Sequence, residues 1–160
     1  MVRSCRAVAA ILLFWAGFVN NLWAETPYTI SVRHSGDDFV GRQFFFELKE
    51  VIRESQGFKL SSGPEAEIRI NLHTMDAEEN QRYTVVTVVV SMRNHNKFQP
   101  DQPQTWYPIY LTSFTAAIGV TKVDVSATQT LALIDEAIED YSEEERKYRD
   151  KAERQQNPAQ

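Results

Sequence analysis

The sequence predicts an α+β fold, a two-layer sandwich in which a mainly antiparallel sheet of about five strands carries two helices on one face. Three observations support this prediction. Strand-like and helical patterns follow one another in the order strand, helix, several strands, helix. The second to fifth strands are joined by polar turns and can pair as antiparallel hairpins. Both helical segments have one apolar side, which can cover a sheet.

The first strand is expected at residues 28–33, YTISVR, where apolar and polar residues alternate as in a half-buried strand. The segment that follows, HSGDDF, holds Ser35, Asp37 and Asp38. All three are residue types that cap the start of a helix, and acidic side chains suit its positive end. A helix is therefore expected to begin close to residue 39.

This helix is expected to cover residues 39–56. Phe45, Leu48 and Ile52 are spaced three and four apart, so they form one apolar stripe. Gly57 stands where helices commonly end in a left-handed turn.

The middle of the chain is expected to add four strands. Residues 58–61 form a short one, and residues 67–73 alternate most regularly. Residues 82–92 are rich in β-branched side chains and apolar on both sides, which favours a central position. After a polar loop, residues 105–114 form an aromatic strand. The sheet face away from the helices is expected to be polar, with Thr29, Ser31, Arg33, Glu67, Arg69, Asn71 and His73.

The second helix is expected from about Ser126 to residue 141. Its apolar residues are spaced three, four and three apart, and they are Leu131, Ile134, Ile138 and Tyr141. Residues 142–160 lose this stripe and contain acidic residues four positions before basic ones, as in Glu143 and Lys147. We expect residues 25–141 to form a single domain and residues 142–160 to be a charged helical extension with a disordered tail.

Residues 1–24 resemble a secretory signal peptide. Arg3 and Arg6 precede an apolar run of thirteen residues, which is too short to cross a hydrocarbon core that needs about 20. Ala24 is a small residue suited to cleavage, although Leu22 is larger than usual for its position. The alternative is a leader that stays attached as a membrane anchor.

Cleavage after Ala24 would leave 136 of the 160 residues, enough for one core. Without Arg3 and Arg6, 15 of the 17 basic residues remain against 22 acidic ones, a net charge of −7. That balance disfavours binding to nucleic acids or anionic lipid surfaces. The single cysteine, Cys5, would leave with the leader, and no Asn-x-Ser/Thr acceptor occurs. We therefore expect a bacterial periplasmic location.

No catalytic motif is evident, and no cofactor or metal is expected. His34, Ser35, Asp37 and Asp38 include the residue types of a hydrolytic triad, but helix capping explains them with fewer assumptions. A metal site could in principle combine His95 with the polar segment after residue 72. The residues of that segment with suitable side chains are His73, Asp76, Glu78 and Glu79. Their spacing in the sequence matches no known metal-binding motif, and a solvated turn explains these residues better.

An aromatic cluster is the candidate binding surface. Trp106, Tyr107 and Tyr110 surround Pro108 in the last strand, and exposed aromatic side chains often anchor interfaces. Pro108 cannot donate to a ladder, which favours an edge strand that could accept a strand of a partner. The alternative is that the side chains on one face of this strand fill the core, while those on the other face pack under the long preceding loop or the C-terminal helix.

The sequence therefore favours an exported accessory or binding protein of the periplasm, which acts through contacts with a protein or envelope component. The alternative is a periplasmic hydrolase or metal-dependent enzyme that uses His34, His73 or His95. Oligomeric state, partner and pathway are not determined by the sequence.

Overall fold

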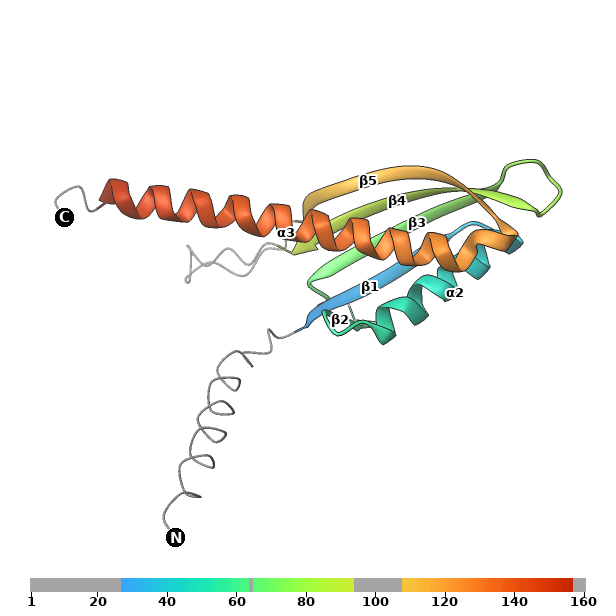
Figure 1. The fold of residues 1–160 in the computed structure, drawn as a ribbon, viewed down its shortest axis with the longest axis horizontal. Helices are drawn as coiled ribbons and strands as arrows, with labels where there is room; N and C mark the ends of the chain where they lie inside the picture. Colours follow the sequence, from blue (N-terminus) through green and yellow to red (C-terminus); the bar gives the residue numbers. More distant parts are fainter. Residues whose placement is uncertain (1–26, 64, 94–107, 157–160) are drawn as a thin grey trace, which may run out of the picture.

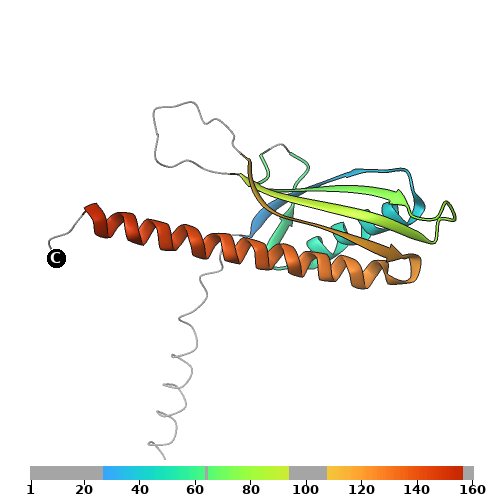
Figure 2. The same cartoon turned by 90° about the horizontal axis from the view of Figure 1, so that it is seen from above.

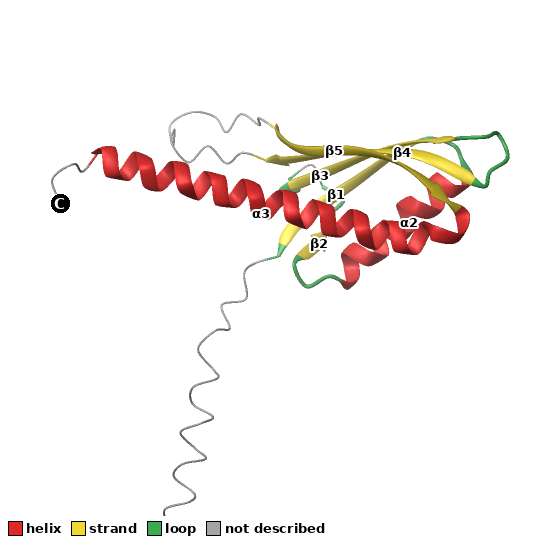
Figure 3. Cartoon of the chain, turned by 45° about the horizontal axis from the view of Figure 1, so that its top comes forward, coloured by secondary structure: helices red, strands yellow, loops and turns green. Residues whose placement is uncertain are grey.

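The computed structural model describes residues 27–63, 65–93 and 108–156, and it has the α+β architecture expected from the sequence (Figure 1). Five strands and two long helices make two layers, with both helices on the same face of the sheet (Figure 3). In chain order the elements are β1 (Tyr28–Ser35), α2 (Phe39–Glu54), β2 (Phe58–Leu60), β3 (Ile68–Asp76), β4 (Tyr83–Arg93), β5 (Pro108–Gly119), the short 3₁₀ helix η1 (Val120–Lys122) and α3 (Val123–Gln156).

The sheet is mixed, with strand order β2-β1-β3-β4-β5. β1 runs parallel to both β2 and β3, while the longer β3–β4 and β4–β5 pairings are antiparallel. One detail of the expected hairpins is wrong. β2 and β3 do not pair with each other, because they lie on opposite sides of β1. The crossover through α2 returns the chain to one edge of β1, and the next strand must then use the other edge.

The alternation along the strands separates a core face from an open face, as expected. On the core face Ile30 lies opposite Ile68, and on the open face Ser31 lies opposite Arg69. The core residues of β3 and β4 are almost fully buried: Ile68, Ile70 and Leu72 on β3, and Val86, Val88 and Val90 on β4. The open face carries the polar residues expected there, because one side of a sheet with antiparallel pairs can remain in water.

α2 begins at the expected cap and ends differently from the expectation. Asp38 is the N-cap residue, and its side chain accepts a hydrogen bond from the Gly41 N–H. The helix ends at Glu54, where the next residue is extended, and the positive φ expected for Gly57 does not occur. The buried stripe is centred on Phe44 and not on Phe45. α2 crosses the sheet so that Phe44 points to the core, and Phe45 is half-buried at its margin.

α3 is a single helix of 34 residues that extends beyond the sheet (Figure 2). Its first half is anchored by the expected stripe, since Leu131, Ile134 and Ile138 are buried. Tyr141 is half-buried, and every residue from 143 to 155 is exposed. About 14 residues of helix therefore project from the two-layer body, a length of roughly 20 Å at 1.5 Å per residue.

Across the described ranges, the helices all lack a stretch that is both long and apolar enough to cross a membrane.

Candidate functional site

A polar cluster lies where the carboxyl ends of β1 and β3 meet the start of α2. The Nε2 atom of His34 lies 2.8 Å from the Thr74 hydroxyl, and the His34 ring stacks on Phe45 with 5.3 Å between ring centroids. Partial burial against this ring lowers the pKa of His34 below its usual value of 6.5. Burial therefore favours the neutral form of His34, which suits a structural hydrogen bond to Thr74.

Asp38 is the buried carboxylate of this cluster. One oxygen, Oδ1, accepts the Gly41 N–H at 2.6 Å. Among the described residues, Oδ2 has no hydrogen-bond partner of standard geometry, although the Thr74 and Thr84 hydroxyls are close enough to stabilise its charge. Burial raises the pKa of Asp38, but these hydroxyls and the Gly41 N–H outweigh it, so the net pKa lies below the usual 3.8.

His34, Ser35, Asp37 and Asp38, which include the residue types of a hydrolytic triad, do not form a triad in the structure. Ser35 hydrogen-bonds to His73 of the neighbouring strand, with 2.6 Å between Oγ and Nδ1, while His34 points to the other face of the sheet. In the part of the chain that the structure describes, no carboxylate bonds to the second ring nitrogen of His73. Asp38 caps α2, and Asp37 is exposed. The Ser35–His73 pair is the part of this set with the geometry of a nucleophile and a base.

The acidic segment after β3 forms the turn of the β3–β4 hairpin. Both carboxylate oxygens of Asp76 accept backbone N–H groups, from Glu78 at 3.1 Å and from Gln81 at 2.7 Å. Glu79 adopts a left-handed conformation with φ 56°. Over residues 27–63, 65–93 and 108–156, no three His, Cys, Asp or Glu side chains are grouped to hold a metal ion. His95, the remaining ligand suggested from the sequence, lies outside the described residues.

β5 is an edge strand, as Pro108 suggested. Within the described residues it has a strand neighbour on one side only. Its sequence, PIYLTSFTAAIG, contains no charged residue. Tyr110 is 61% exposed, and its hydroxyl lies 2.8 Å from that of Ser113. Trp106 and Tyr107, which were expected to share this surface, lie outside the described residues.

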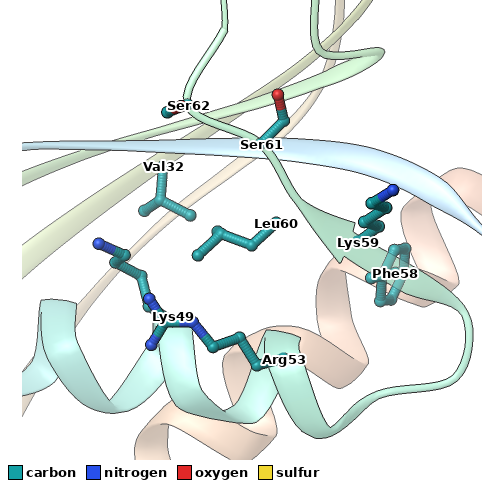
Figure 4. A pocket seen from close by; sticks show the side chains of 8 residues that line it. All are labelled: Val32, Lys49, Arg53, Phe58, Lys59, Leu60, Ser61 and Ser62. Carbon is teal, nitrogen blue, oxygen red and sulfur yellow. The ribbon is translucent and has the colours of Figure 1, made fainter.

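A recess of about 560 Å³ lies between α2 and the β2 edge of the sheet. Val32 and Leu60 point toward Lys49 and Arg53 (Figure 4). Arg53 forms an ion pair with Glu50, whereas the Nζ atom of Lys49 lies 4.9 Å from the centroid of the Phe45 ring. The recess therefore combines an apolar wall with a lysine, a combination that suits a small anionic group attached to an apolar one.

Comparison with known proteins assigns no family, because no family description and no curated protein match this sequence. Among solved structures, the chain is similar to the hypothetical protein CT253 from Chlamydia trachomatis. The two are 11% identical, the match covers 61% of this chain and 76% of that one, and the TM-score is 0.35. So distant a likeness carries no functional argument.

Thr74 and Thr84 belong to the polar cluster, and the sequence singled out neither of them. A Cβ atom added to Gly36 or to Gly41 would overlap the Oγ1 atom of Thr74, so both glycines are needed for the loop and helix to pack on β3. Gly36 also has φ 137°, a conformation that other residues rarely adopt. Two glycines within six residues were the available signal for this close approach.

Proposed function

We propose that this chain is an exported accessory or binding protein of the bacterial periplasm, which acts by contact with another protein or envelope component. The observation that carries the proposal is the uncharged edge of β5. Proteins usually protect long edge strands with charged residues or cover them, because an open edge is a template for another strand. β5 has twelve residues without a charge, and exposed Tyr110 lies beside this edge.

An extended segment of a partner would add to the sheet at this edge. Its backbone would pair with β5, and an apolar or aromatic side chain of the partner would rest beside Tyr110. The bulge between β4 and β5 at Val90 and Ser91 lies next to Tyr110 and changes the direction of the first residues of β5. Export is supported by the pattern of residues 1–24, and the acidic charge favours solubility in that compartment.

A photo-crosslinking amino acid placed at residue 110 tests this function in the native host. We expect residue 110 to give an adduct with one periplasmic protein, and the purified adduct to begin at Glu25. The matched control is residue 83, because Tyr83 is also an exposed tyrosine (46%) but lies on the internal strand β4. Thr115→Lys, which adds a charge to β5, should remove the adduct.

Two results would contradict the proposal. One is the same set of adducts from residues 110 and 83, since contact would then not depend on the edge strand. The other is full-length chain, still starting at Met1, in the cytosolic fraction.

A second candidate, a serine-dependent hydrolase, is favoured by the 2.6 Å contact between Ser35 and His73. A fluorophosphonate probe that labels activated serines distinguishes the two candidates. Labelling that is lost in Ser35→Ala and His73→Gln, but kept in the control Ser113→Ala, would establish the hydrolase. We expect no labelling, because the pair is exposed and His73 lacks an orienting carboxylate among the described residues.

A further inference from the structure

The charges of α3 are separated along its length. Residues 135–145 carry seven acidic residues and no basic one. Residues 146–154 carry five basic residues and two acidic ones. We refer to these segments as the acidic block and the basic block. Most of both lies on the exposed surface of the helix, and the basic block lies entirely on the part that projects from the body.

The acidic block repels itself within its own helix. Side chains three and four positions apart are neighbours on a helix, and like charges at this spacing are destabilising. Glu136 has acidic neighbours at 139 and 140, and Glu139 has them at 135, 136 and 143. No basic side chain of the described residues lies within 4 Å of the carboxylates at positions 135–140. Within the described residues, these carboxylates therefore have no ion-pair partner from their own chain.

The basic block has a smaller excess of the opposite sign, with five basic residues against two acidic ones. Lys151 has Lys147 and Arg154 as its neighbours at four and three positions. The ion pair that the structure forms at the junction of the blocks, between Glu143 and Lys147, is exposed and has an N–O distance of 3.0 Å. Such exposed pairs contribute little on their own. A helix with an acidic half followed by a basic half places opposite charges against its own reversed copy.

We propose that two copies of this chain associate through antiparallel pairing of their α3 helices. Six residues spaced three, four, four, four and three apart lie along the solvent side of the helix, opposite the buried Ile134 and Ile138: Glu136, Glu139, Glu143, Lys147, Lys151 and Arg154. With a two-fold axis at residue 145, Glu136 faces Arg154 of the second copy, Glu139 faces its Lys151, and Glu143 faces its Lys147. Symmetry repeats each pair, as in any isologous dimer.

The position of α3 on its own two-layer domain permits antiparallel pairing with a second α3. The paired side of α3 faces away from its own sheet, so the two sheets would lie on opposite outer sides of the helix pair. The projecting residues 143–155 provide the length that lets the second helix run past the first body. The same register sets Asp140 opposite Asp150, and the surface contains few apolar side chains. The dimer is therefore expected to be weak and to dissociate as salt rises.

Charge reversal tests the pairing. The full chain is expressed so that any processing of the leader takes place, and the product is examined by analytical ultracentrifugation in low and high salt. Two triple variants are compared. One reverses the acidic block, with Glu136→Lys, Glu139→Lys and Glu143→Lys. The other reverses the basic block, with Lys147→Glu, Lys151→Glu and Arg154→Glu. Each alone should weaken self-association roughly tenfold or more.

An equimolar mixture of the two variants should restore association, because one helix is then wholly basic along this side and the other wholly acidic. A control reversal outside α3, Arg42→Glu with Lys59→Glu, should leave the wild-type equilibrium unchanged. Circular dichroism of each variant checks that the helix is retained. A wild-type chain that stays monomeric at millimolar concentration in low salt would overturn the proposal. So would a mixture of helical variants that does not associate.

Discussion

Replacing Phe44 with alanine is expected to lower the free energy of unfolding by about 3–5 kcal/mol. Phe44 is fully buried on α2, where it packs into the core between the helices and the sheet. Removing its ring deletes a large apolar surface and leaves a cavity that the neighbouring strands cannot close. Chemical denaturation followed by circular dichroism measures the change.

Phe46 provides a matched control on the same helix. It is the same residue type two positions away, but 60% of it is exposed. Phe46→Ala should change the free energy of unfolding by less than about 1 kcal/mol, because little surface leaves the core. Similar losses for the two variants would mean that the stripe of α2 is not centred on Phe44.

Asp38→Ala is expected to destabilise the chain by about 1–2 kcal/mol at pH 7, the usual effect of losing a helix cap. The substitution removes the acceptor of the Gly41 N–H and leaves the buried Thr74 and Thr84 hydroxyls without a carboxylate. Asp37→Ala is the control, since Asp37 is exposed and its backbone carbonyl, which accepts from Arg42, remains. Asp38→Asn should keep much of the cap, because asparagine also accepts the hydrogen bond.

The effect of Asp38 depends on pH in a defined direction. The folded state lowers the pKa of Asp38 below 3.8, so the charged form is favoured in the folded chain. Its contribution is complete above pH 3.8 and is lost as the pH falls through the folded pKa. The difference in stability between wild type and Asp38→Ala should therefore shrink in strong acid. A difference that does not change between pH 7 and pH 2 would show that the charge contributes nothing.

The local patterns of the sequence were sufficient for the fold class. The cap at Asp38 and the stripe that contains Ile134 and Ile138 depend on neighbours within one turn, and the structure has both. The assignment of Phe45 to the centre of the α2 stripe was wrong, because Phe44 and Phe45 fit the helical period almost equally well. Only the angle at which α2 crosses the sheet decides between them.

The pairing of strands could not be obtained in the same way. Nothing in the three residues of β2 indicates which edge of β1 they join. The contact between Ser35 and His73 spans 38 positions and follows from the register of β1 and β3. The approach of Gly36 and Gly41 to Thr74 is also a product of tertiary packing. For the candidate site, sequence patterns therefore gave the residue types but not their partners.

β1 lies between two strands that both come later in the chain. The register joins Tyr28 to Phe58 and Ile30 to Ile68, so neither neighbour exists when β1 leaves the ribosome. The β3–β4 hairpin, by contrast, closes over a turn of only a few residues. The first strand to be synthesised consequently has no native strand partner until residue 58 has been made, and its second edge is completed only by residues 68–73.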